Sequence, residues 1–244
     1  MDKGTVVAIK ECKMATAGVN AAIEGLAKTA RVANTRLLIR EGDGVVATNS
    51  RDVLTQTING SKFQFKAGGF FQINAGVTQI LAAHVVECVR GYGGIVDTHC
   101  GVGLLSICIA TQAEVGVRVV GTELDEDSVA FARTNARANG VGAICDFVAC
   151  DAAESFKGVE FKGERVCVVA DPPRAGLSKK YIRELLKFKP DRFVYVSCDV
   201  GTQARDSRAL LEEGEYVVQE VTPFDMFPHT SHVESVAVFD RVQR

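Results

Sequence analysis

The chain has 244 residues, 47% of them hydrophobic, and a formal net charge of −2 at pH 7. This is enough apolar material for one sizeable core, but no run approaches the roughly 18 apolar residues of a membrane helix. The first ten residues lack the apolar segment of a secretory signal, and the eight cysteines form no C-x-x-C pair. We therefore expect no membrane association and no metal, with reduced thiols in the cytoplasm or in another reducing compartment such as the nucleus or an organelle.

Charge is distributed unevenly along the chain. Residues 1–66 carry ten Lys and Arg against six Asp and Glu, whereas residues 67–244 carry eighteen against twenty-four. The overall charge does not indicate nucleic acid, and ordinary surface variation could produce this difference. A basic appendage beside an acidic core is nevertheless compatible with RNA binding.

The N-terminal segment, residues 1–66, reads as a small α+β unit. Residues 12–30 have the pattern of an amphipathic helix. Residues 36–39 and 45–47 are predicted strands that flank Glu41-Gly42-Asp43-Gly44, a sequence that favours a hairpin turn. This segment is too short for a core of its own, so we expect it to pack on the main domain or to be part of a larger one.

From Gly94 onward, short β-rich runs alternate with amphipathic helices, which predicts an α/β fold with a parallel sheet covered by helices. The predicted strands are residues 94–97, 117–123, 144–150, 166–170 and 193–197, and the predicted helices are residues 103–111, 126–139, 179–187 and 202–213. Residues 216–221 and 233–239 are two more strands joined only by a loop, so they should pair as an antiparallel hairpin. Such a seven-stranded, mostly parallel sheet with a C-terminal antiparallel hairpin is typical of class I methyltransferases.

Acidic residues and glycines gather at the ends of the first three of these strands. Asp97-Thr98-His99-Cys100-Gly101-Val102-Gly103 follows a strand and precedes a helix, where glycines let the backbone approach a ligand. Glu123 ends the second strand and could accept from both hydroxyls of an adenosyl ribose, and Asp151 follows the third. Each acid alone could simply cap a helix. No lysine follows the glycines as in a phosphate-binding loop, so adenosine without phosphates fits better than a nucleotide.

A second group of motifs follows the later strands. Asp171-Pro172-Pro173-Arg174-Ala175-Gly176 holds Asp171 extended at the sheet edge, and Arg174 replaces the stacking aromatic of amino-methylating enzymes. Cys198 ends the fifth strand just before a helix, where a thiolate would be partly stabilised, although a small packed cysteine is the simpler reading. The loop at residues 225–234 adds two histidines and Glu234. A Cys–His hydrolase is a rival interpretation, but it lacks an oxyanion hole and leaves the adenosyl-type edge without a role.

Together these motifs resemble the RNA uracil-5 methyltransferase family, which forms 5-methyluridine in transfer and ribosomal RNA. The resemblance spans about Phe70 to Arg241, with weaker similarity over residues 12–40. Its specific parts are Gly69-Phe70-Phe71-Gln72-Ile73-Asn74, D-x-x-C-G-x-G at 97–103, D-P-P-R-A-G at 171–176, S-C-D at 197–199, and D-M-F-P-H-T-x-H-x-E at 225–234.

The resemblance implies a methyltransferase catalytic domain at residues 67–244, S-adenosyl-L-methionine as cofactor, and RNA (tRNA or rRNA) as substrate. We expect a monomer. Cys198 falls on the family's nucleophile and Glu234 on its proton acceptor. The thiolate would activate uracil carbon 5 by adding to carbon 6, and the base would remove the carbon-5 proton from an unstacked nucleotide. The expected cofactor contacts are Gln72, His99, Gly101, Gly103, Leu104, Glu123, Asp151 and Asp171. The expected substrate contacts are Phe71, Asp171, Arg174 and His229.

Three positions depart from the family pattern. Leu104 stands where asparagine is common, His99 replaces an aromatic residue, and Asp199-Val200 follows Cys198 in place of Asn-Pro. The family's N-terminal oligonucleotide-binding barrel and the iron–sulfur cysteines of some members are absent, which indicates a compact member or part of something longer. An RNA-binding or RNA-folding protein with little turnover stays open as an alternative. RNA cytosine-5 methylation is a second one, although its Pro-Cys and Thr-Cys settings do not occur here.

Overall fold

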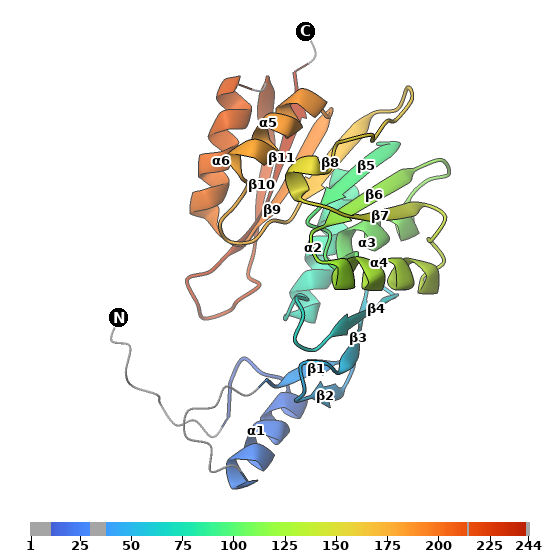
Figure 1. Cartoon of the computed structure of the whole chain (residues 1–244). Coiled ribbons are helices and arrows are strands. Elements are labelled where there is room, and N and C mark those ends of the chain that lie inside the picture. Colours follow the sequence, from blue (N-terminus) through green and yellow to red (C-terminus); the bar gives the residue numbers. More distant parts are fainter. Residues whose placement is uncertain (1–10, 30–37, 214, 243–244) are drawn as a thin grey trace. The chain divides into compact units, whose positions relative to one another are not determined.

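The computed structural model describes residues 11–29, 38–213 and 215–242. The chain divides into two compact units (Figure 1). The first comprises the described residues of Met1–Gln56 together with Phe65–Phe70, and the second comprises Thr57–Gln64 together with Phe71–Arg244.

The first unit contains helix α1 (Ala17–Thr29) and the hairpin of β1 (Arg40–Gly42) and β2 (Val45–Ala47). The predicted hairpin turn is present, with Asp43 and Gly44 both at positive φ. The helix begins at Ala17 rather than at residue 12, because Thr16 caps it by accepting from the backbone N–H of Val19. The first strand is residues 40–42 rather than 36–39. Residues 30, 36 and 37 of these two predictions lie outside the described residues.

A second hairpin, β3 (Val53–Ile58) and β4 (Ser61–Lys66), was not predicted from the sequence. It turns at Asn59 and Gly60, which both have positive φ, as the favoured two-residue hairpin turn requires. Helix α2 (Ala75–Cys88) was also not predicted.

The second unit contains a seven-stranded sheet, and every element predicted between residues 94 and 213 is present with ends within two residues of the prediction. The bounds are β5 (Gly94–Thr98), α3 (Leu104–Gln112), β6 (Arg118–Glu123), α4 (Glu126–Ala138), β7 (Cys145–Ala149), the 3₁₀ helix η1 (Ala152–Glu154), β8 (Val166–Ala170), α5 (Lys179–Phe188), β9 (Arg192–Ser197), α6 (Val200–Glu213), β10 (Tyr216–Phe224) and β11 (Glu234–Arg241).

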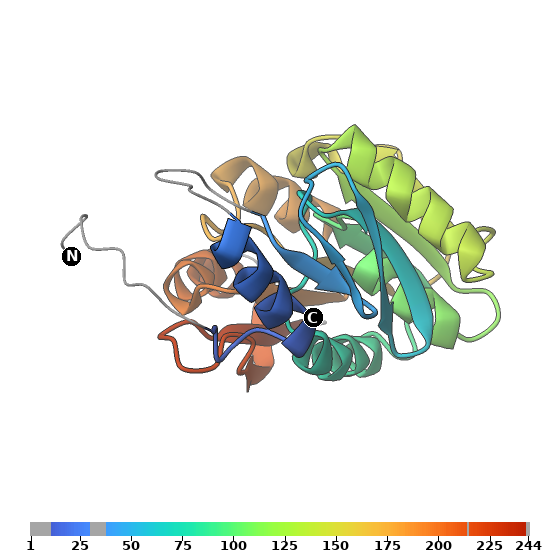
Figure 2. The same ribbon diagram turned by 90° about the horizontal axis from the view of Figure 1, so that it is seen from below.

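The strand order is β10-β11-β9-β8-β5-β6-β7. Strands β5 to β9 are parallel, and β11 pairs antiparallel with both β9 and β10, so the predicted fold class is confirmed. Helix α3 contacts both α2 and α4, and α5 contacts both η1 and α6. Figures 1 and 2 show the sheet between these two groups of helices. In the described part of the chain, no helix has the length and apolar character needed to cross a bilayer.

Two asparagines of α4 bind the backbone of β4 inside the second unit. The Asn135 amide accepts from the Gln64 N–H (2.8 Å) and donates to the Gln64 carbonyl (3.1 Å). Asn139 makes the same pair of bonds with Lys62, at 2.9 and 2.8 Å. Four residues of helix advance about 6 Å and two residues of strand advance about 6.6 Å, so the spacings match closely. Asn135, which is 1% exposed, also donates to the Val102 carbonyl (3.0 Å).

This arrangement predicts unequal losses of stability from two similar substitutions. Asn135→Ala should lower the free energy of unfolding by roughly 2–3 kcal/mol, because it leaves buried backbone groups unpaired. Asn139→Ala, at a half-buried position, should cost only about 1 kcal/mol, because water can replace the lost amide. Urea unfolding of both variants measures this difference, and equal losses would contradict the proposed role of burial.

Candidate active site

The residues singled out from the sequence follow strands that end at one edge of the sheet. β5 ends at Thr98, β6 at Glu123, β8 at Ala170 and β9 at Ser197. Parallel strands bring their carboxyl ends to the same edge. β11 starts there, because Ser235 pairs with Ser197. The adenosyl-type residues and the reactive residues therefore share this edge.

The loop between β5 and α3 is tightly turned. His99, Gly101 and Gly103 have φ values of 61°, 54° and 88°, and this conformation is uncommon for a residue other than glycine. A side chain at Gly101 would meet nothing within 4 Å, so this backbone is open to a ligand. At Gly103 a Cβ would lie 3.1 Å from both Ile107 and Phe147. Glycine at 103 is thus favoured both by its positive φ and by close packing against neighbouring side chains.

Two buried polar atoms beside this loop have no hydrogen-bond partner among the described residues. They are Oδ1 of Asp97 and Nδ1 of His99. The other Asp97 oxygen accepts from the backbone N–H (3.0 Å) and the hydroxyl (2.5 Å) of Ser106. Burial raises the pKa of Asp97 to about 7 and lowers the pKa of His99. Buried polar atoms are normally satisfied, so the unpaired atoms fit a site that binds a polar ligand.

Glu123, which ends β6, and Asp151, which follows β7, have different hydrogen-bond partners. The Glu123 carboxylate accepts from the backbone N–H groups of Gly101 (3.1 Å), Leu124 (2.7 Å) and Asp125 (3.0 Å). A carboxylate has about four acceptor positions, so Glu123 keeps capacity for a ligand hydroxyl. Helix α4 is capped by Asp125, not by Glu123. Asp151 does cap η1, by accepting from Ala153 (2.8 Å), and its side chain is exposed.

The register of β9 and β11 brings Cys198 and Glu234 to neighbouring positions. Ser235 lies opposite Ser197, so the next residue on each strand is Glu234 and Cys198. Glu234 is 2% exposed, and burial raises its pKa to about 7, while Arg174 acts in the opposite direction. A carboxyl group that titrates near neutral pH can act as a base there.

The environment of the Cys198 thiol differs from the sequence-based expectation. Burial, followed by the charges of Glu234 and Asp171, raises its pKa, while Arg174 lowers it. The helix N-terminus was expected to favour the thiolate, but the net shift, caused first by burial and then by these two carboxyl groups, favours the thiol. Asp171 itself has a pKa well above its usual range because of burial, Glu234 and Asp97, and its hydrogen bond with Gln72 works against that shift.

Helix α6 holds the two loops that carry the reactive residues. The Asp199 carboxylate accepts from the Thr202 N–H (2.8 Å), and these backbone bonds lower the pKa of Asp199. The Thr202 hydroxyl lies within hydrogen-bond distance of the carbonyls of Asp199 (3.0 Å) and Arg174 (3.2 Å). The segment after Cys198 is therefore fixed by a helix cap in place of a proline.

Asp206 anchors the Asp171–Gly176 loop from the next turn of α6. This buried carboxylate accepts from the Leu177 N–H (2.7 Å) and from the Tyr195 hydroxyl (2.9 Å). A Cβ at Gly176, whose φ is 75°, would lie 2.4 Å from the Asp206 carboxylate, so only glycine fits. Sequence reasoning did not identify Asp206 or Ser106, since their partners lie on other segments.

The residues expected to contact substrate or cofactor differ in how far they are exposed. Phe71, expected to contact substrate, is 4% exposed and packs against Phe63 with ring centroids 6.0 Å apart, so its ring belongs to the core. Leu104 is likewise nearly buried, at 9% exposed. The side chains of Arg174 and His229 are exposed. Within residues 11–29, 38–213 and 215–242, no group of three His, Cys, Asp or Glu could hold a metal ion.

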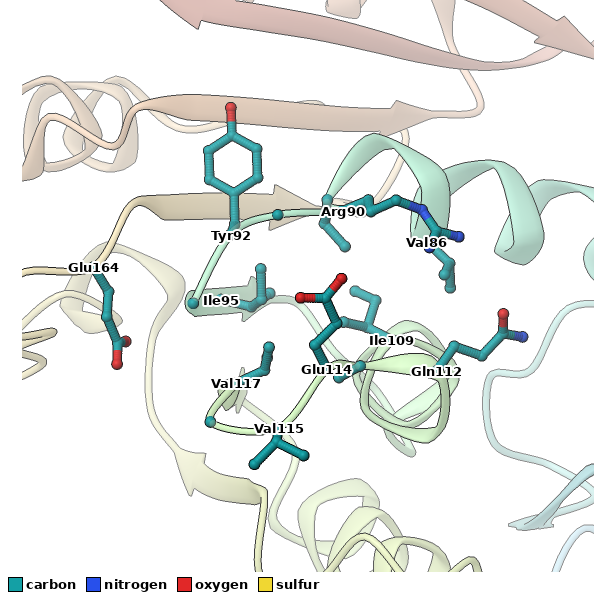
Figure 3. Close-up of a pocket in the computed structure, with 15 residues that line it drawn as sticks. Val86, Arg90, Tyr92, Ile95, Ile109, Gln112, Glu114, Val115, Val117 and Glu164 are labelled. Carbon is teal, nitrogen blue, oxygen red and sulfur yellow. The ribbon is translucent and has the colours of Figure 1, made fainter.

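A cavity of about 330 Å³ lies at the opposite edge, where β5 and β6 begin (Figure 3). Its lining includes Arg90, Tyr92, Glu114, Val115 and Val117. None of the site residues expected from the sequence lines this cavity, so it is separate from the candidate active site.

The strand order, the glycine loop after β5 and the acid that ends β6 define a class I S-adenosylmethionine-dependent methyltransferase fold. The solved structure of Pyrococcus abyssi tRNA (uracil-54, C5)-methyltransferase in complex with S-adenosyl-L-homocysteine matches with a TM-score of 0.66 and 33% identity. The match covers 80% of this chain and 45% of that chain.

The sequence matches the tRNA (uracil-5-)-methyltransferase family over residues 19–242, so the chain belongs to this family and the resemblance is confirmed. It is 35% identical over 207 residues to the tRNA (uracil(54)-C(5))-methyltransferase of Saccharomyces cerevisiae, covering 80% of this chain and 32% of the relative. The enzyme of the same name from Schizosaccharomyces pombe is 32% identical over 260 residues, covering 97% and 49%. The chain thus spans about a third to a half of the length of these relatives.

The raised pKa of Glu234 predicts that Glu234→Gln stabilises the ligand-free protein, and more so at higher pH. The folded protein keeps the Glu234 proton where the unfolded chain has lost it, so stability falls as pH rises from about 4.5 to about 7. Glutamine resembles the protonated form and has no such dependence. Thermal unfolding should show little difference near pH 4 and a gain of roughly 1–3 kcal/mol at pH 8. A gain that is constant with pH would contradict this electrostatic origin.

Proposed function

We propose that this chain catalyses the S-adenosylmethionine-dependent methylation of carbon 5 of a uridine in RNA. The observation that supports it most is the neighbouring placement of Cys198 and Glu234, a nucleophile and a base, at the carboxyl edge of a methyltransferase fold. Transfer RNA is the proposed substrate class, because the similar proteins above are named tRNA (uracil-54, C5)-methyltransferases.

The cofactor would be held by the loop from His99 to Gly103 and by the acids after β6 and β7. When bound, S-adenosylmethionine supplies an electrophilic methyl group on a positively charged sulfur. Glu123 has free acceptor capacity for the ribose, and the exposed Asp151 could accept from the adenine amino group. Asp97 keeps an unpaired buried oxygen beside this loop, which a hydrogen-bond-donating or positively charged group of the cofactor would satisfy.

Cys198 and Glu234 would divide the chemistry between them. Cys198 would release its thiol proton to solvent and bond through sulfur to carbon 6 of uracil. Carbon 5 then becomes nucleophilic and takes the methyl group as the bond from that group to the donor sulfur breaks. Glu234 then takes the carbon-5 proton, the sulfur–carbon bond breaks, and the uracil double bond re-forms. The pKa of Glu234, about 7, suits this step near neutral pH. Arg174 favours the ionised forms of both residues.

The substrate nucleotide must leave its stack to reach these groups. Arg174 and His229 are exposed and could contact RNA from the segments that carry Asp171 and Glu234. The excess of Lys and Arg in residues 1–66 supports a role for that segment in RNA binding, and residues 67–244 would form the catalytic domain.

The division of labour predicts that the two residues fail differently when replaced. Cys198→Ala should abolish methylation without leaving a covalent species. The Glu234→Gln enzyme should still form the sulfur–carbon bond and methylate the uracil. It should then stall, because the carbon-5 proton is not removed. Denaturing electrophoresis with a radioactive methyl donor and transfer RNA should show a labelled protein–RNA adduct for Glu234→Gln. Methyl transfer by Cys198→Ala would refute this mechanism. RNA binding by wild type without methylation would favour the non-catalytic alternative.

Cofactor binding can be tested separately from the chemistry. Glu123→Ala should weaken S-adenosylmethionine binding by roughly 1–3 kcal/mol, as expected for the loss of charge-assisted hydrogen bonds to the ribose. Asp125→Ala, two residues away, should lower stability by about 1 kcal/mol through loss of the α4 cap and leave affinity unchanged. Isothermal calorimetry compares the variants. Equal affinities for wild type and Glu123→Ala would remove Glu123 from the cofactor site.

A further inference from the structure

A glutamine in the first turn of α6 connects the strands that carry the reactive pair. Gln203 is 6% exposed. Its Nε2 donates to the Tyr195 carbonyl of β9 (2.9 Å) and, at a longer distance, to the Ser235 carbonyl of β11 (3.4 Å). Its Oε1 accepts from the Ser235 hydroxyl (2.6 Å). Carbonyl oxygens can only accept, so this network fixes the orientation of the amide.

These bonds lie where the regular pairing of the two strands ends. Ser235 opposite Ser197 is the last pair of the β9–β11 register at this edge. β9 ends at Ser197, so Cys198 lies beyond the ladder, and Glu234 is the first residue of β11. The β9–β11 ladder therefore stops one residue short of both Cys198 and Glu234, while Glu234 pairs with Phe224 of β10 on its other side. Gln203 bonds to β9 and to β11 within three residues of this end.

We propose that Gln203 is a positioning residue that sets the separation between the Cys198 sulfur and the Glu234 carboxyl group, and so governs proton removal from the adduct. This inference rests on the proposed function. While the sulfur holds carbon 6, the carboxyl group has to reach the proton on carbon 5 of the same ring. A misplacement of about 1 Å can slow such a step by up to about 100-fold.

The rate of adduct breakdown distinguishes positioning from general destabilisation. In a single turnover with labelled methyl donor and transfer RNA, the rate constant for loss of the covalent adduct does not depend on how much enzyme is folded. Gln203→Ala should slow this decay by roughly 10- to 100-fold while adduct formation stays within about threefold of wild type. Ser235→Ala removes one bond and leaves both amide donations in place, so it should slow decay by a smaller factor. Gln219→Ala, at an exposed position of β10, is the matched control and should decay as wild type does.

Gln203→Met separates hydrogen bonding from packing, because it keeps the length of the side chain without its polar atoms. It should decay as slowly as Gln203→Ala, and a wild-type rate would overturn the proposal. If Gln203→Ala does not fold, Ser235→Ala and Gln203→Met carry the test. Wild-type decay in Gln203→Ala, with a normal adduct in wild type, would overturn the role of Gln203 alone. Methylation by wild type without any adduct, including with 5-fluorouridine RNA, would overturn the proposed mechanism as well.

Discussion

Burial of carboxyl groups beside a cysteine is the electrostatic constraint on which this site depends. Asp97, Asp171 and Glu234 come from three segments, and burial raises the pKa of each. Like charges in a poorly solvated place oppose folding, so a rigid scaffold has to hold them together. The core strands β5, β8 and β9, whose residues are almost all buried, provide that scaffold. The same arrangement gives the Glu234 carboxyl group a pKa of about 7, so that it can take up or release a proton near neutral pH.

Helix α6 fixes the relative positions of the segments that form this edge. Its first two turns reach the segment after Cys198 through Asp199 and Thr202, the Asp171–Gly176 loop through Asp206, and β11 through Gln203. One helix is therefore hydrogen-bonded to three segments of the site that are distant in the sequence. It also explains how the chain keeps order after the cysteine where its sequence departs from the Asn-Pro of its family.

The sequence predicts the sheet and the meeting of the site residues, because alternating β-rich and amphipathic runs define parallel strands whose ends converge. It did not predict α2 (Ala75–Cys88), since this helix is apolar on most of its surface and has little periodicity. The β3–β4 hairpin, by contrast, does have a local signal, because Asn59-Gly60 is the favoured sequence for a two-residue turn with positive φ at both positions. The raised pKa of Cys198 comes first from burial and then from the charges of Glu234 and Asp171, which lie on segments distant in the sequence. Local patterns hold no information about such partners.

The position of β11 in the sheet has a consequence for how the chain matures during synthesis. β11 is the last of the described strands to be made, yet it lies between β9 and β10 (Figure 1). Chains emerge from the ribosome from their N-termini at roughly 5–20 residues per second, so β5, β6 and β7 are available several seconds before β11. The adenosyl-type half of the edge can thus assemble on a nascent chain that still lacks Glu234. Cys198 gains Glu234 as a neighbour only when β11 inserts, so under the proposed function the cofactor half of the edge would form before the pair of reactive residues is complete.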